Sequence, residues 1–217
     1  LSEQAQAGFT NAIVRDEAEF RQLSGSIAVY RTAHALALGN PPQAMAFAQQ
    51  ALQRLGEDSH VMRGAANALL GLAYWTNGEL AAAYNRYADG MASLQMAGFI
   101  ADAIGGAIIL ADIQIVRGVL RKAMRTYERG LQLAIKQGTP LLRGTADIYV
   151  GMSELLSEQN DLSTAMQYLM RSREQGEHTG FPQHPYRWRV AMARIRAVQG
   201  DLDGALDLIQ VSKPGYN

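Results

Sequence analysis

The most concentrated chemistry in this chain lies in one short basic segment, HPYRWRVAMARIR (184–196). It holds four arginines beside two aromatic residues: Arg187, Arg189, Arg194 and Arg196 with Tyr186 and Trp188. Guanidinium groups next to aromatic rings suit recognition of carboxylates or phosphates, because the planar fork donates paired hydrogen bonds. Nucleic acid is one interpretation, but four arginines spread around about three helical turns make a weak patch. An intramolecular or partner contact fits the segment at least as well.

The residue types that usually catalyse reactions or bind metals are not grouped in this sequence. No two histidines have the i, i+4 spacing of a helical metal site; the four are His34, His60, His178 and His184. Three of them fall near expected helix ends or breaks, where contact with solvent or with the helix dipole is the ordinary role. Cysteine is absent, and no serine has a histidine and an aspartate arranged to activate it. We therefore expect no enzyme activity, no metal site and no cofactor in this chain.

The composition gives no global attraction to polyanions. Lys and Arg number 20 and Asp and Glu number 20 among the 217 residues, so the formal net charge is zero. No apolar run approaches the roughly 20 residues of a transmembrane helix. We expect no direct nucleic-acid binding, no membrane association and a cytoplasmic location. The chain has neither an initiator Met nor the pattern of a secretory signal, so we expect it to be a piece of a larger multidomain protein.

A six-residue motif recurs along the chain and indicates an internal repeat. Its copies are GELAAA (78–83), GVLRKA (118–123), NDLSTA (160–165), GDLDGA (200–205) and the weaker GNPPQA (39–44). The closing alanines are separated by 39, 40, 42 and 40 residues; they are Ala44, Ala83, Ala123, Ala165 and Ala205. A period of about 40 residues built from Ala- and Leu-rich segments predicts helical hairpins.

Each copy of the motif has the chemistry of a turn between two helices. Its Gly or Asn permits the left-handed conformation that ends the first helix, and the next carboxylate favours the start of the second. Small residues lie twelve positions before the closing alanine, as at Gly71 before Ala83, and let the two helices approach closely. Tyr87 and Tyr127, four residues after an alanine, are expected to fill the space between helices. The leucine two positions after the Gly or Asn is expected to hold the turn against the core; these leucines are Leu80, Leu120, Leu162 and Leu202.

The repeats together predict an all-α fold, a right-handed superhelix (α-solenoid) of about five TPR-like hairpins in one domain over residues 1–217. The spacing of small and large residues is similar to that of tetratricopeptide repeats, with a longer period than their usual 34 residues. The expected hairpins are 19–56, 59–97, 99–137, 140–179 and 184–211. Residues 1–18 are expected to form the second helix of a preceding hairpin.

Aligned repeats separate core positions from candidate binding positions. Trp75 falls in an apolar column and is expected in the core, whereas Tyr74 falls in a polar one. Asp112 and Arg194 are charged residues in an otherwise apolar column. Since first helices commonly line the concave surface of a solenoid, these polar positions form either solvated faces with salt bridges or a groove that contacts a ligand or peptide. The candidate binding residues are Asn67, Tyr74, Asp112, Gln114, Asp147, Glu154, Arg187, Arg189, Arg194 and Arg196.

Several segments go beyond a generic repeat. RGAANALLGLAYWTNGELAAAY (63–84), RGTADIYVGMSELLSEQNDL (143–162) and above all PYRWRVAMARIRAVQGDLDGALDL (185–208) resemble the helical-repeat region of MalT-like transcriptional regulators of the LuxR type. The resemblance extends from about residue 16 to residue 208. It implies an N-terminal ATPase module, this superhelical region as the sensor of an inducer or partner, and a C-terminal helix-turn-helix.

The chain itself contains neither a phosphate loop nor a helix-turn-helix motif. Under the resemblance, ATP is therefore expected only in a separate N-terminal module, and only the sensor role transfers to these residues. The expected partners are an inducer or a protein or peptide in the concave groove, together with the ATPase and DNA-binding modules of the full-length protein. The alternative is a TPR-type scaffold that holds a peptide or partner subunit.

Overall fold

The structure is a computed structural model that describes residues 17–138 and 141–210. Over this part of the chain the elements are all α-helices, and they follow one another as five hairpins. Their bounds are α2 Glu17–Ala37, α3 Pro41–Arg54, α4 His60–Thr76, α5 Leu80–Met96, α6 Ile100–Val116, α7 Leu120–Lys136, α8 Thr145–Glu158, α9 Leu162–Thr179, α10 His184–Val198 and α11 Leu202–Gln210. We call the first helix of each hairpin its A helix and the second its B helix. The predicted α-solenoid of helical hairpins is confirmed.

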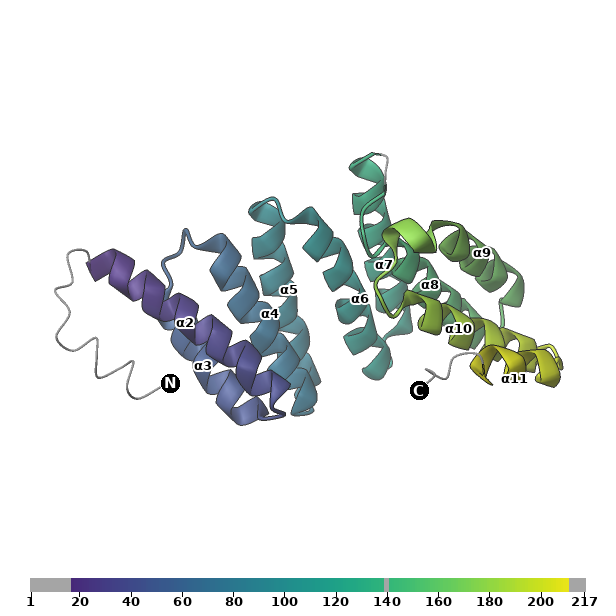
Figure 1. Cartoon of the computed structure of the whole chain (residues 1–217), viewed down its shortest axis with the longest axis horizontal. Coiled ribbons are helices and arrows are strands. Elements are labelled where there is room, and N and C mark those ends of the chain that lie inside the picture. The colour runs from purple at the N-terminus through teal and green to yellow at the C-terminus, as the bar shows by residue number, and fades with distance from the viewer. Residues whose placement is uncertain (1–16, 139–140, 211–217) are drawn as a thin grey trace, which may run out of the picture.

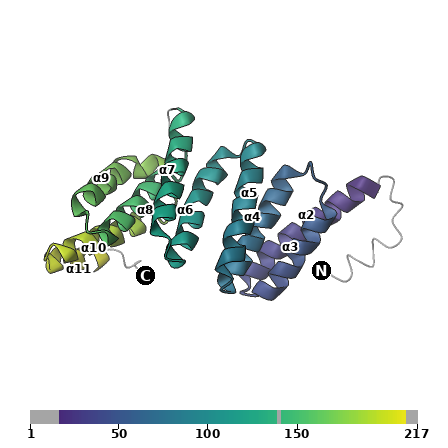
Figure 2. The same ribbon diagram turned by 180° about the vertical axis from the view of Figure 1, so that it is seen from behind.

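The hairpins stack in chain order into an elongated array (Figure 1), and the view from behind shows the same succession (Figure 2). Within each hairpin the two helices pack on each other, and each later A helix packs on the B helix before it. This nearest-neighbour packing is characteristic of a solenoid, in which the core runs along the array. None of the helices in the described residues is both long and apolar enough to cross a lipid bilayer.

The turn inside every hairpin contains one residue in the left-handed region, as the repeat motif predicts. The five residues and their φ angles are Gly39 (68°), Gly78 (84°), Gly118 (73°), Asn160 (60°) and Gly200 (86°). Glycine adopts this conformation without a Cβ penalty, and asparagine tolerates it better than most residues. The motif therefore ends the A helix at the same point in each repeat.

Gly71 and Ala83 form the close contact between α4 and α5 that the repeat register predicts. A Cβ atom on Gly71 would lie 2.8 Å from both the backbone nitrogen and the Cβ of Tyr87, and 3.0 Å from the carbonyl oxygen of Ala83. Ala83 is fully buried. Because backbone atoms cannot move aside as a flexible side chain can, only a residue without a side chain fits at position 71.

We expect Gly71→Leu to destabilise the protein by roughly 1–3 kcal/mol or more, because a leucine there overpacks the α4–α5 contact. Denaturant unfolding of the variant and the wild type measures the change. Ala81→Leu is the matched control, because Ala81 is exposed on α5 of the same hairpin. Equal unfolding midpoints and slopes for Gly71→Leu and the wild type would show that the two helices do not meet at this position.

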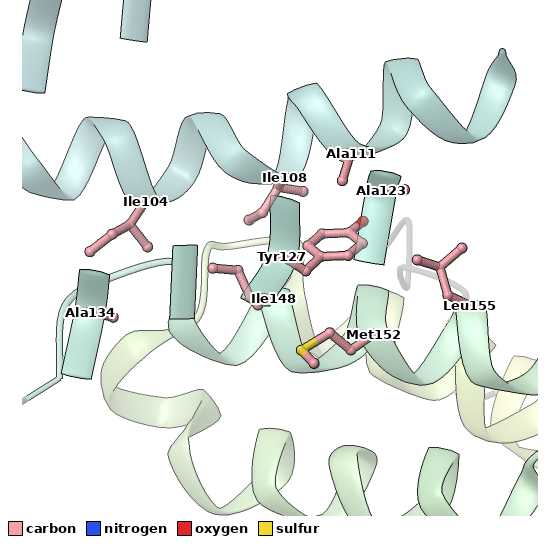
Figure 3. Close-up of a cluster of buried hydrophobic side chains, with 9 residues drawn as sticks. All are labelled: Ile104, Ile108, Ala111, Ala123, Tyr127, Ala134, Ile148, Met152 and Leu155. Carbon is pink, nitrogen blue, oxygen red and sulfur yellow. The ribbon is translucent and has the colours of Figure 1, made fainter. Parts of the chain in front are cut away.

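The centre of the array is a buried cluster shared by α6, α7 and α8 (Figure 3). Tyr127 of α7 lies in its middle with no exposed surface, between Ile108 of α6 and Ile148 and Met152 of α8. This position confirms the space-filling role predicted for Tyr127. The cluster joins the third hairpin to the fourth and holds the A helices α6 and α8 at a fixed separation.

Two predictions about core positions differ from the structure. Trp75 is half-buried rather than in the core; of its repeat equivalents, Ile115 is half-buried, Ala197 is exposed and Leu155 is buried. All four lie in the last turn of an A helix, where burial depends on how far the neighbouring helices extend past that turn, and Leu155 is covered because it packs in a core cluster. Leu202, expected to hold its turn against the core, is 62% exposed at the start of the last described helix. The helix expected over residues 1–18 falls almost entirely outside the described residues.

Candidate functional site

Five of the ten candidate binding residues meet on the A helices of the last three hairpins. We call them the A-face cluster: Asp112 of α6, Asp147 and Glu154 of α8, and Arg187 and Arg194 of α10. Asp147 and Glu154 are seven residues apart, as are Arg187 and Arg194, so each pair lies on one face of its helix. The two faces oppose each other, and an acidic row on α8 meets a basic row on α10.

Arg187 is the central cation of the A-face cluster. Its Nη1 lies 3.4 Å from Oδ1 of Asp147, and its Nη2 lies 3.7 Å from Oε2 of Glu154. Arg194 adds a third ion pair, at 3.7 Å between its Nη1 and Oε1 of Glu154, but its side chain is 65% exposed. Because solvent screens exposed pairs, Arg194 contributes less to this arrangement than Arg187.

Asp147 anchors the cluster from a fully buried position. Besides Arg187, its carboxylate accepts a hydrogen bond from the backbone N–H of Phe181 at 2.8 Å. Phe181 lies in the turn between α9 and α10. Thr179, the last residue of α9, accepts through its carbonyl oxygen a hydrogen bond from the N–H of Gly144 at 2.6 Å. These contacts tie the start of α10 to the start of α8, and thereby fix where Arg187 lies.

Asp112 and Glu154 are incompletely neutralised carboxyl groups. Burial raises the pKa of Asp112, and neither the charge of Arg187 nor the hydrogen bond from Tyr127 offsets it. Burial also raises the pKa of Glu154 against the opposing effect of Arg187 and Arg194. Among the described residues no salt bridge within 4.0 Å reaches Asp112, whose recorded partner is the Tyr127 hydroxyl at 3.2 Å. Perturbed carboxyl groups of this kind concentrate at functional sites.

We expect Asp112→Asn to stabilise the protein at neutral pH. Since the folded-state pKa of Asp112 is raised, its contribution to stability is full only below the unfolded-state value near 3.8 and is lost as the pH rises through the folded-state pKa. Asparagine removes the charge and keeps an oxygen that accepts from Tyr127. Thermal unfolding of both proteins across acidic to neutral pH should show a gap that widens as the pH rises. A stability difference between the two proteins that does not change with pH would contradict a raised pKa of Asp112 in the folded protein.

Arg189 and Arg196 lie away from the A-face cluster. Both line a cavity of about 860 Å³ between α9, α10 and α11, together with Trp188 and several methionines. Arg196 also pairs with Asp201, at 3.6 Å between Nη1 and Oδ2. Trp188 donates its indole N–H to the carbonyl oxygen of Leu169 at 2.7 Å, which fixes the ring in the cavity wall. The basic segment of α10 thus serves two different faces.

The remaining three candidates are not part of either group. Gln114 is buried, and its Oε1 accepts a hydrogen bond from the hydroxyl of Thr126 at 2.8 Å. Asn67 is buried in α4, and its Oδ1 has no hydrogen-bond partner among the described residues. Tyr74 is half-buried near the end of the same helix. Tyr74, Gln114, Glu154 and Arg196 occupy the same polar position in successive repeats. Of these four residues, only Glu154 belongs to the A-face cluster.

Tyr127 also contacts a candidate binding residue, which the sequence did not predict. Its ring fills the core as predicted, but its hydroxyl donates to Oδ1 of Asp112. Burial raises the pKa of the phenol, so the group remains a proton donor at neutral pH. The signal was present in the repeat register, because the close-packed pair Ala111 and Ala123 places Asp112 opposite the helix that carries Tyr127.

His184 differs from the expectation that a histidine near a helix end contacts solvent or the helix dipole. It is 4% exposed, and its Nε2 lies 2.8 Å from Oγ of Ser172. The Ser172 hydroxyl donates to the carbonyl oxygen of Ala146 at 2.9 Å, so it accepts from His184. Burial lowers the pKa of His184. The pair lies between α8, α9 and α10, and His184 also lines the cavity that Arg189 and Arg196 border. Within the described residues no group of three or more histidine or acidic side chains could hold a metal ion.

The stacked helical hairpins are those of a TPR-like helical-repeat module, a class of fold that typically binds proteins. The family model described as the MalT-like TPR region matches residues 25–213, and the chain belongs to this family. The predicted resemblance to a MalT-like helical-repeat region is thereby confirmed.

Solved structures with the same fold extend over nearly the whole chain. BtubC (BKLC) from P. vanneervenii superposes with a TM-score of 0.66 at 15% identity and covers 93% of this chain and 94% of its own. A putative kinesin light chain from Podosopora anserina with nearly identical TPR-like repeats gives a TM-score of 0.63 at 14% identity, covering 91% and 94%. At these identities the likeness concerns the fold alone. No curated protein matches the sequence.

Proposed function

We propose that this chain is the sensing region of a MalT-like, LuxR-type transcriptional regulator, and that it acts by binding rather than by catalysis. An inducer or a protein partner binds on the A helices and changes how successive hairpins pack. In the full-length protein this change is passed to separate ATPase and DNA-binding modules, while this region contacts neither nucleic acid nor membrane. Membership in the MalT-like TPR family supports the proposal.

The observation that carries the proposal is the A-face cluster, because it connects three consecutive hairpins. Arg187 of α10 pairs with Asp147 and Glu154 of α8, and its charge also acts on Asp112 of α6. A ligand that competes for Arg187 or Glu154 alters contacts between hairpins. Since a ligand shifts a conformational equilibrium by its differential affinity for the two states, a site that spans hairpins can convert binding into a change of the array.

Binding rather than catalysis is supported by the state of the groups that could react. Ser172 is fully buried, its hydroxyl donates to a backbone carbonyl oxygen, and His184 is held against it. Within the A-face cluster, Asp147 and Arg187 are engaged with each other. These groups orient helices. The half-buried carboxyl of Asp112 has no ion pair among the described residues, and a ligand at Glu154 would compete with its pairs to Arg187 and Arg194.

The test is isothermal calorimetry of this chain against a panel of small metabolites and nucleotides. We expect a bound ligand to lose about tenfold or more in affinity with Glu154→Gln, which removes a charge and preserves the shape of the side chain. Glu158→Gln is the matched control, because Glu158 is exposed one turn further along α8. A ligand equally affected by both variants contradicts binding at the A-face cluster. Silence toward every small molecule, with tight binding to a protein, favours the alternative of a TPR-type scaffold.

A further inference from the structure

The outer face of α7 is the most basic helical surface in the described part of the chain outside α10. The helix carries five cations and a single acid, Glu128, and all six side chains are exposed. We call four of the cations the α7 ridge: Arg121, Arg125, Arg129 and Lys136. At 100° per residue they fall within an arc of about 80°, and at 1.5 Å per residue they extend over about 22 Å.

The charges of the α7 ridge are not neutralised within the described residues. No salt bridge reaches any of its four members, whereas on the neighbouring B helix α5 the cation Arg86 lies 4.0 Å from Asp89. Arg121, Arg125 and Arg129 follow one another at i, i+4 spacing, which places like charges side by side. The ridge therefore opposes the stability of its own helix, and an anionic partner would relieve the repulsion.

Apolar grooves flank the ridge on both sides. Arg121 and Arg125 border a groove of about 310 Å³ toward α8 and α9, whose floor includes Met124, Leu156 and Tyr168. Arg129 and Lys136 border a groove of about 480 Å³ toward α5 and α6, whose floor includes Met91, Leu110 and Leu133. No residue of the A-face cluster lines either groove. Each floor includes at least one methionine, whose flexible side chain adapts to different apolar partners, so both grooves suit a peptide surface.

We infer that the α7 ridge and its two grooves form a docking surface for an acidic amphipathic helix of a partner protein. In a helix with carboxylates at i, i+4 spacing, successive carboxylates lie about 6 Å apart along the helix axis. The successive arginines of the ridge have the same interval. Its carboxylates pair with the guanidinium groups, and its apolar side chains enter the grooves. This surface is separate from the A-face cluster. The result of a peptide-binding test on the α7 ridge therefore does not depend on whether an inducer binds at that cluster.

A nucleic acid fits the same surface less well. Polyanion binding rests on neutralising successive phosphates and gains nothing from apolar grooves. Glu128 lies beside the ridge on the same helix, where it repels a continuous phosphate backbone and is tolerated by a peptide of discrete charges. The whole chain has no net positive charge to attract nucleic acid from a distance. Arginines without ion pairs beside grooves with apolar floor residues therefore favour a peptide.

The experiment is fluorescence anisotropy with a labelled synthetic helix of about 18 residues, long enough to span the ridge, with Glu at every fourth position and Leu on the adjoining face. Arg125→Glu is the decisive variant. Position 125 lies between Arg121 and Arg129. A glutamate there replaces two repulsive i, i+4 pairs by attractive ones, so we expect the variant to keep its fold. Arg54→Glu, a charge reversal at an exposed position of α3, is the matched control.

We expect the wild type to bind the peptide, Arg125→Glu to weaken binding about tenfold or more, and Arg54→Glu to change it less than about twofold. Binding should weaken as the salt concentration rises. Three outcomes overturn the inference. One is no binding by the wild type, and another is equal binding by Arg125→Glu. The third is equal or tighter binding of a scrambled peptide of the same composition, or of single-stranded DNA of similar length.

Discussion

Replacing Asp147 by alanine is expected to lower the free energy of unfolding by about 3 kcal/mol, the lower end of the range for removing one partner of a buried ion pair. Asp147 is fully buried, whereas the side chain of Arg187 is 21% exposed and keeps its contact with Glu154. Solvent therefore still stabilises part of the positive charge that Arg187 retains in the variant, which keeps the expected loss at the lower end of the range. Denaturant unfolding at constant pH measures the loss.

The loss has two physical sources. Alanine leaves the partly buried backbone N–H of Phe181 without its acceptor; an unsatisfied donor costs about 1–3 kcal/mol when fully buried, and less where water reaches it. It also removes the carboxylate that holds Arg187 against α8. Both contacts fix the start of α10, so the variant should also open the junction between the fourth and fifth hairpins before the rest of the array.

Two controls separate these sources. Glu158→Ala removes an exposed carboxylate from the same helix and should change stability by no more than about 0.5 kcal/mol. Asp147→Ala in an Arg187→Met background measures the coupling between the two side chains, since a double-mutant cycle isolates the pairwise contribution. If Asp147→Ala costs the same in both backgrounds, the ion pair contributes nothing and the hydrogen bond to Phe181 carries the effect.

The hairpins could be predicted because local chemistry determines them. Gly78 and Gly118 end their A helices through the backbone freedom of a residue without a side chain, and that property is visible in the sequence alone. Gly71 could also be identified from the sequence, because two helices can approach this closely only where a side chain is missing. Trp75 and Leu202 were predicted wrongly, since the cover over a residue at a helix end depends on how neighbouring helices extend past it.

The A-face cluster was only partly visible in the sequence. Asp112 and Arg194 interrupt an apolar column, and the structure places both in the cluster. Arg187 and Arg189 look equivalent in the sequence, but two residues correspond to about 200° around a helix, so they serve opposite faces. The bond between Asp147 and Phe181 could not be foreseen, because it depends on a turn 34 residues further along the chain. The burial of His184 arises from the same turn.

Tyr127 connects the core to the A-face cluster, and replacing it by alanine should cost about 3–5 kcal/mol, the range for deleting a buried aromatic ring. The ring is fully buried between α6 and α8, and a Cβ on Gly151 would overlap it, so the surroundings are shaped to this side chain. Collapse of α8 into the resulting cavity would bring Glu154 closer to Asp112. Unfolding in denaturant measures the cost.

Tyr127→Phe separates the two roles of the residue. Phenylalanine keeps the ring and removes the hydroxyl, so the stability loss should be only about 0.5–1.5 kcal/mol. Because the hydroxyl lowers the pKa of Asp112 by donating to it, its removal should raise that pKa further. Asp112→Asn should then stabilise the Tyr127→Phe protein more at neutral pH than it stabilises the wild type. An equal gain in both backgrounds would show that the core tyrosine fills space without acting on the carboxyl group that the proposed ligand would meet.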